Sequence, residues 1–128
     1  DSPIVANNLA SLLVTYRDDD ASLERAFTVG RRLRGTEVPP FQDTYGWILF
    51  RGGETEDALT YLEPAASVLA EDPFVLYHLG RAYQELGRSE DALEKYERAV
   101  ELAGDDDSRA QISDSAASID VISTAPKE

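Results

Sequence analysis

Few residues of this 128-residue chain can carry reaction chemistry. His78 is the single histidine and cysteine is absent, so a catalytic triad, a zinc–thiolate site and a disulfide all lack partners. Gly52 and Gly53 are not followed by the Gly-Lys-Ser/Thr of a phosphate-binding loop. The aspartate runs at 18–20 and 105–107 lack the alternating spacing and closing glutamate of an EF-hand. We therefore expect no enzyme activity, no metal site and no cofactor.

Composition narrows the class of partner. Apolar residues make up 42% of the chain, which is enough for a core. The sequence contains no run of about 18 apolar residues, so we expect no direct membrane insertion. The net charge of −13 repels phosphate backbones and anionic lipid, so we expect no nucleic-acid partner. Two interpretations of this charge stay open, a solvated acidic surface or a preference for a basic partner.

Small and turn-forming residues recur at a fixed spacing of 34 positions (46 to 80, 53 to 87, 58 to 92). The earlier set, Pro39, Gly46, Gly53, Ala58, Leu62 and Ala65, is matched in order by Pro73, Gly80, Gly87, Ala92, Tyr96 and Ala99. A fixed period of this length is the sequence signature of a repeated helical hairpin.

Start and stop signals divide each repeat into two helices. Asp72 followed by Pro73 marks a helix start, and Ser2 followed by Pro3 repeats this signal. Gly87 predicts a left-handed helix end.

The second helix of each unit has its own expected features. We expect Ser89 and Thr55 to cap the second helices of their units. Pro64 lies inside the second helix of the middle unit, where we expect it to kink that helix or end it early.

The two ends of the chain fit the repeat less closely. Residues 3–37 resemble a degenerate first unit, separated from the next by a loop about two residues longer. After Gly104 a thin apolar stripe at Ile112, Ala116 and Ile119 predicts a last helix from about 108 to 121. A disordered tail is the competing interpretation of this polar segment.

This pattern resembles the tetratricopeptide repeat family over residues 3–104. The residues that carry the resemblance are Leu79, Gly80, Tyr83, Ala92, Tyr96 and Ala99. It implies an all-α, right-handed solenoid of about three helix-turn-helix repeats plus a C-terminal capping helix. The predicted parts are a degenerate repeat at 1–37, repeats at 38–71 and 72–104, a capping helix or partly disordered tail at 105–123, and a frayed terminus at 124–128.

A closer resemblance lies in residues 43–49, preceded by residues 6–10. These segments are similar to the C-terminal repeats of long bacterial tetratricopeptide proteins associated with exopolysaccharide production and PEP-CTERM envelope systems. That resemblance implies a periplasmic or envelope location, with the cytoplasm as the alternative. Because the chain begins at Asp1 in mid-pattern, we expect it to be a fragment or a processed form.

The resemblance also implies a function, which is to present a concave groove to a peptide or helix of a partner protein. The positions that face such a groove are Asn7, Ser11, Asp43, Trp47, Phe50, Arg51, Tyr77, Arg81 and Gln84. Trp47 and Phe50 are the most informative, because aromatic side chains beside arginine are typical of binding hot spots. A core role is the alternative for this pair. The family's Lys/Asn clamp for a C-terminal carboxylate does not fit, because no lysine precedes Lys95.

Other roles stay open at this point. The chain could be a structural end of a longer solenoid or a regulatory domain of a larger enzyme. Self-association through residues 105–128 is a further expectation, in which the tail of one copy occupies the groove of another.

Overall fold

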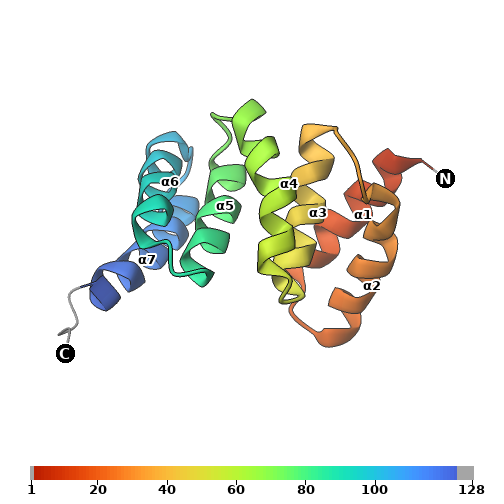
Figure 1. The fold of residues 1–128 in the computed structure, drawn as a ribbon, viewed down its shortest axis with the longest axis horizontal. Coiled ribbons are helices and arrows are strands. Elements are labelled where there is room, and N and C mark those ends of the chain that lie inside the picture. The colour runs from red at the N-terminus through yellow and green to blue at the C-terminus, as the bar shows by residue number, and fades with distance from the viewer. Residues whose placement is uncertain (1, 124–128) are drawn as a thin grey trace. The chain divides into compact units, whose positions relative to one another are not determined.

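The computed structural model describes the backbone of residues 2–123 and the side chains of residues 2–119. Within that range the chain forms seven α-helices and a short 3-10 helix, without any strand. The all-α prediction is therefore confirmed. The chain divides into two compact units, residues 1–69 and 70–128 (Figure 1). The predicted frayed terminus at 124–128 lies outside the described residues.

The first unit consists of two helical hairpins. Its elements are α1 (Pro3–Tyr16), α2 (Asp20–Gly30), η1 (Arg31–Leu33), α3 (Pro39–Arg51) and α4 (Thr55–Val68). Helix α1 pairs with α2, and α3 pairs with α4. Helix α3 also packs against both α1 and α2, so it lies at the centre of this unit.

The second unit consists of one hairpin and an added helix. Helix α5 (Pro73–Glu85) pairs with α6 (Ser89–Leu102), and α7 (Asp106–Ser123) packs against α6 and α5. The last helix is thus longer at both ends than the predicted 108–121. Ile112 and Ile119 of its apolar stripe are both buried, which explains why this polar segment orders against its neighbours.

Aspartate and serine start several helices as the sequence predicts. The Asp72 carboxylate accepts hydrogen bonds from the backbone N–H of Phe74 at 2.9 Å and of Val75 at 3.3 Å. Ser2 Oγ accepts a bond from the N–H of Ile4 at 3.1 Å. These bonds satisfy N–H groups that have no partner inside the helix.

The predicted caps at Thr55 and Ser89 are wrong by one residue. Both are the first residues of their helices, and Glu54 and Arg88 occupy the cap positions without side-chain capping bonds. The N–H of Glu54 donates to the Leu49 carbonyl at 2.8 Å, and that of Arg88 donates to Tyr83 at 2.9 Å.

Each of these hydrogen bonds reaches the carbonyl five residues earlier and closes the end of the preceding helix. They require the positive φ of Gly53 (87°) and Gly87 (77°), which confirms the predicted left-handed end at Gly87. The turn is complete at the residue after each glycine, so the next helix begins one position earlier than a cap at Thr55 or Ser89 implies.

Pro64 does not end its helix, because α4 continues from Thr55 to Val68. The prediction of an early end is wrong. Proline removes one N–H and crowds the carbonyl four residues earlier, here that of Thr60. Because Pro64 and Thr60 are exposed, water can satisfy that carbonyl.

The hairpins depend on close approach at two glycines. A Cβ atom at Gly80 would lie 2.6 Å from Tyr96 Cε1, and one at Gly46 would lie 2.7 Å from Leu62 Cγ. The repeated glycine therefore makes room for the large residue that the partner helix places opposite it.

Candidate functional site

The predicted groove residues are distributed over both units. Asn7 and Ser11 lie on α1, and Asp43, Trp47, Phe50 and Arg51 lie on α3. Tyr77, Arg81 and Gln84 lie on α5 of the second unit.

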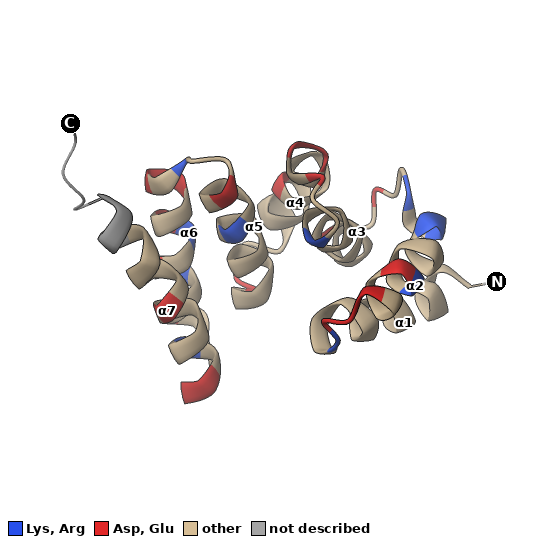
Figure 2. Ribbon diagram, turned by 90° about the horizontal axis from the view of Figure 1, so that it is seen from below, with Lys and Arg blue, Asp and Glu red and all other residues tan. Residues whose placement is uncertain are grey.

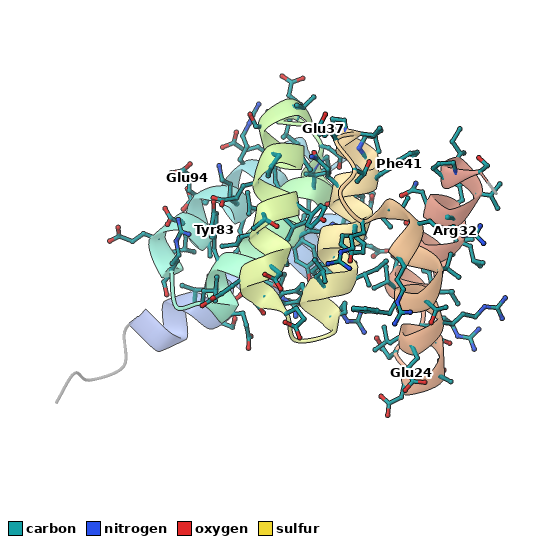
Figure 3. The ribbon with its side chains drawn as sticks, turned by 45° about the vertical axis from the view of Figure 1, so that its right-hand side comes forward. Glu24, Arg32, Glu37, Phe41, Tyr83 and Glu94 are labelled. Atoms are coloured by element: carbon teal, nitrogen blue, oxygen red, sulfur yellow. The ribbon has the colours of Figure 1, made fainter. Side chains whose placement is uncertain are left out.

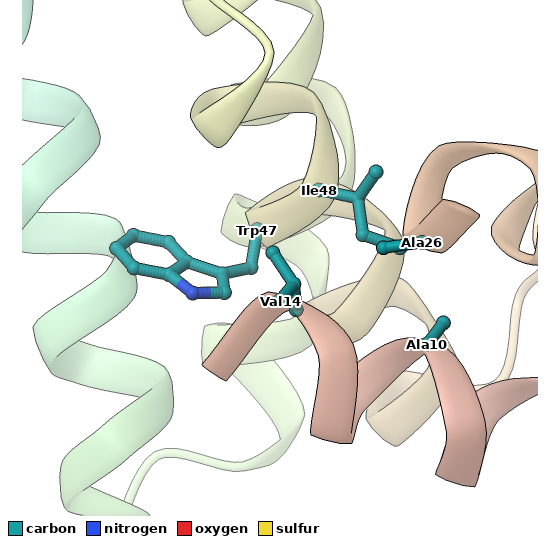
Figure 4. Packing of buried hydrophobic residues seen from close by; sticks show 5 residues of the cluster. All are labelled: Ala10, Val14, Ala26, Trp47 and Ile48. Carbon is teal, nitrogen blue, oxygen red and sulfur yellow. The ribbon is translucent and has the colours of Figure 1, made fainter. Parts of the chain in front are cut away.

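Trp47 belongs to the hydrophobic core of the first unit. Its side chain clusters with Ala10, Val14, Ala26 and Ile48, and only 6% of the residue is exposed (Figure 4). Phe50 packs against this cluster and stacks on Trp47, with ring centroids 4.9 Å apart and planes inclined by 11°. The core role, which the sequence left open as the alternative, thus describes Trp47, whereas Phe50 is only partly buried.

The central place of α3 explains this burial. All six residues from 44 to 49 are buried, so this helix has no free face over that stretch. A helix covered on several sides has no polar stripe. Helical periodicity identifies which residues share a face, but the number of covered faces depends on the neighbours.

Arg51 is engaged within its own unit. Its Nη1 donates to the Val14 carbonyl at 2.9 Å, and its Nη2 contacts the Asp18 carboxylate at 2.8 Å. The guanidinium therefore ties the end of α3 to the end of α1 and satisfies a carbonyl that the last turn of α1 leaves open.

Asn7, Ser11 and Asp43 are partly buried. The Asn7 Oδ1 atom is buried and has no hydrogen-bond partner among the described residues. A buried acceptor in this state costs about 1–3 kcal/mol.

In the second unit the three predicted residues join a hydrogen-bond network that reaches α7. The Tyr77 hydroxyl accepts from Arg81 Nη1 at 2.9 Å and from Gln111 Nε2 at 3.4 Å. Gln84 donates from Nε2 to Ser118 Oγ at 2.9 Å. The amide oxygen of Gln84 accepts from the Tyr96 hydroxyl at 2.7 Å.

The two tyrosines of this network respond differently to burial. Burial raises the pKa of Tyr96 above its ordinary value. Burial also acts to raise the pKa of Tyr77, but hydrogen bonding with Ser115, Arg81 and Gln111 outweighs it and holds that pKa below the ordinary value.

A surface hollow of about 500 Å³ lies beside this network, between α5 and α7. Its lining consists of Arg81, Gln84, Glu85, Asp114, Ser115 and Ser118. We call it the α5–α7 hollow. Hydroxyl and amide groups, two exposed carboxylates and one guanidinium line it, which is a set that can hydrogen-bond a peptide backbone and hold basic side chains.

The sequence prediction missed the α7 half of this hollow. The signal was present, because adding the repeat spacing to 77, 81 and 84 gives 111, 115 and 118. Two bonds, Gln111 to Tyr77 and Ser118 to Gln84, join residues separated by that period of 34. The α7 residues of the hollow therefore lie one repeat period after their counterparts on α5.

The first unit has a hollow of its own, with a volume of about 720 Å³. Its lining consists of Phe27, Arg31, Arg34, Tyr45, Leu49, Glu54, Asp57, Thr60 and Tyr61. Most of these residues come from α2, η1 and α4 and not from the positions predicted to face a groove. The Tyr61 hydroxyl accepts the N–H of Gly35 at 2.9 Å, and the Tyr61 ring packs edge-on against Tyr45. We therefore interpret this hollow as part of the hairpin packing.

The described residues also bear on metal binding and on membrane insertion. No group of three or more His, Asp or Glu side chains is arranged to hold a metal ion in the described part of the chain. Among the described helices none has the length and apolarity needed to cross a membrane.

Comparison with known proteins supports the repeat. Residues 73–106 match the family model described as tetratricopeptide repeat. The match covers α5 and α6 and reaches the first residue of α7. No protein of curated function matches the sequence.

A solved structure extends the likeness to nearly the whole chain. The Yersinia enterocolitica type III secretion translocator chaperone SycD superposes with a TM-score of 0.71. The alignment covers 96% of this chain and 88% of that chain, at 17% sequence identity. At this identity the likeness shows the fold, which is an all-α array of tetratricopeptide-type helical hairpins.

Proposed function

We propose that the chain is a non-catalytic protein-interaction module that holds a basic peptide segment of a partner protein in the α5–α7 hollow. One observation carries this proposal. The hollow is built from positions one repeat period apart on neighbouring helices, at 81 and 84 on α5 and at 115 and 118 on α7. Repeat arrays bind ligands through surfaces of this kind, which their neighbouring helices share.

The chemistry of the hollow supports a peptide ligand. Gln84, Ser115 and Ser118 carry amide and hydroxyl groups that suit backbone N–H and carbonyl groups. Glu85 and Asp114 are exposed carboxylates at its edge, and the whole chain carries a net charge of −13. Charges at the edge of a binding site attract an oppositely charged partner and raise its association rate.

For the first unit by itself we propose a separate partner contact through the predicted groove residues Phe50 and Arg51, which are partly exposed, together with Asn7, Ser11 and Asp43, which are partly buried. Trp47 acts there as support, because it fixes the ring of Phe50 by stacking. Rigidly held aromatic and arginine side chains are the groups that dominate many interfaces.

We also propose that the partner belongs to a bacterial envelope or exopolysaccharide assembly. This narrower proposal rests on the resemblance of residues 43–49 to the repeats of such proteins. The SycD likeness is compatible with a partner-holding role, since that protein is named as a translocator chaperone. Loss of exopolysaccharide secretion on deletion of the gene would support the narrower proposal, and unchanged secretion would refute it.

The proposed function can be tested with a displayed library of random peptides. We expect the chain to select peptides rich in Lys and Arg. Removal of both edge charges, with Glu85→Gln and Asp114→Asn together, should weaken the selected peptide about five-fold, since exposed charge pairs contribute up to about 1 kcal/mol. Isothermal titration calorimetry measures this change.

A matched control removes the same charge elsewhere in the same unit. Glu94 and Glu97 are exposed on α6, and the Glu94 side chain extends into solvent (Figure 3). Glu94→Gln with Glu97→Gln should leave the affinity within two-fold of the starting value. An equal loss of affinity for both double variants would show that the net charge of the chain, and not the hollow, attracts the peptide. Failure to select any peptide would refute the module and favour a purely structural or regulatory role.

A further inference from the structure

Helix α1 carries an apolar stripe that the other described residues leave largely exposed. Val5, Leu12 and Tyr16 are 64%, 57% and 76% exposed, and Leu9 between them is only partly buried. The opposite side of α1 supplies the buried residues of its hairpin, Ala6, Ala10 and Val14. Helix α1 thus has two apolar faces and uses one of them within its own unit.

The stripe has the spacing of a coiled-coil seam. Its members are separated by steps of four, three and four residues (5 to 9, 9 to 12, 12 to 16). That alternation is the repeat of the a and d positions that face a partner helix. The order 4-3-4 also reads the same in both directions. A second α1 in antiparallel orientation would therefore place Val5 against Tyr16 of the other copy, and Leu9 against Leu12.

Charge favours the same partner. No residue of α1 from Pro3 to Tyr16 is charged, although the chain as a whole has a net charge of −13 (Figure 2). Asn8 and Thr15, which flank the stripe, are exposed and uncharged as well. Two copies of an acidic chain repel each other, and α1 is a surface at which they can meet without opposing like charges.

We propose that two copies of this chain associate through antiparallel packing of their α1 stripes around a two-fold axis. This surface is separate from the α5–α7 hollow, so the dimer does not depend on the proposed peptide site. Two short helices bury less than the roughly 1,200 Å² of a standard interface, so we expect a weak dimer with a Kd on the order of 10 μM.

This surface also differs from the C-terminal segment expected from the sequence to mediate self-association. Ile112 and Ile119 of α7 are buried within the second unit, so exchange of that segment would require α7 to leave its own chain.

Sedimentation equilibrium at 5–500 μM tests the dimer. We expect the mass to rise with concentration toward twice the 14.1 kDa of one chain. Leu12→Glu should give a monomer throughout, and Val5→Glu should weaken association at least ten-fold. Val68→Glu is the matched control, because Val68 is a valine of similar exposure, 66%, on α4 of the same unit. Equal loss for Val5→Glu and Val68→Glu, or a monomer for the unaltered chain at every concentration, would overturn the proposal.

Cross-linking tests the orientation, and the chain offers a background without native cysteine. Mixing Val5→Cys chains with Tyr16→Cys chains should give a disulfide-linked dimer under mild oxidation. Each variant alone should not, because its two copies would lie about 16 Å apart along the helix axis, beyond the roughly 7 Å a disulfide can span. Efficient cross-linking of Val5→Cys alone would show a parallel pair and overturn the proposed geometry.

Discussion

The close contact at Gly80 makes a quantitative prediction about the hairpin of α5 and α6. In Gly80→Ala the added methyl carbon would lie 2.6 Å from Tyr96 Cε1 and 2.8 Å from Cδ1. The ring cannot easily move aside, because Tyr96 is fully buried and its hydroxyl is held by Gln84 at 2.7 Å. Overpacking of this kind costs about 3 kcal/mol at its upper end. Alanine recovers about 1 kcal/mol through its higher helix propensity.

We therefore expect Gly80→Ala to lower the free energy of unfolding by about 2 kcal/mol, the balance of these two effects. Urea denaturation followed by circular dichroism at 222 nm measures it. That signal reports on the helices of both units. Gly104→Ala is the control, because a Cβ there meets nothing within 4 Å and its φ is not positive. This control should be neutral or slightly stabilising.

A double-mutant cycle identifies the cause of the loss. In a Tyr96→Ala background the obstructing ring is gone, so the same Gly80→Ala change should stabilise the chain by about 1 kcal/mol through helix propensity. An unchanged stability of Gly80→Ala in the native background would refute the steric argument. So would an equal loss with and without the ring.

Three further predictions follow from individual contacts. Arg51→Ala should lower the free energy of unfolding by about 2 kcal/mol through loss of the bond to the Val14 carbonyl. Asp18→Asn should lower it by less than about 0.5 kcal/mol, because Asp18 is 94% exposed. A larger loss for Asp18→Asn would contradict the view that the carbonyl bond contributes more than the ion pair. Hydrogen bonds from Ser108 lower the pKa of Asp105. The Asp105 carboxylate therefore stabilises the fold above its ordinary pKa of 3.8 and loses that effect as the pH falls through the lowered value. The difference in melting temperature between the native chain and Asp105→Asn should shrink over that acid range and stay constant above pH 5. Trp47→Ala should cost about 3–5 kcal/mol in urea denaturation because it empties a core position, whereas a loss under 1 kcal/mol would show that the ring is not part of the core.

The helical hairpins could be predicted from the sequence because their determinants are local. The spacing from Gly46 to Gly80 reflects a packing requirement that each hairpin meets in the same way. Asp72 caps the helix that directly follows it, and Gly87 closes the helix that directly precedes it. The cap and the helix end depend on residues within a few positions of one another, so neither requires knowledge of the surrounding structure.

The burial of individual site residues could not be predicted in this way. Trp47 lies on a helix that other elements cover on several sides, and that number of neighbours is a tertiary property. Ser115 and Ser118 were missed because small polar residues give no hydrophobic period, although the 34-residue register identifies them. Pro64 is accommodated inside α4 at a place where Pro64 and Thr60 are both exposed, and a sequence pattern does not show that exposure.

The most direct measurement for the proposed binding role is the map of backbone amide chemical shifts as the selected basic peptide is titrated into the chain. We predict the largest changes at Arg81, Gln84, Ser115 and Ser118, which line the α5–α7 hollow. Changes concentrated instead around the hollow of the first unit, at Arg31, Arg34 and Tyr61, would contradict the assignment of the site.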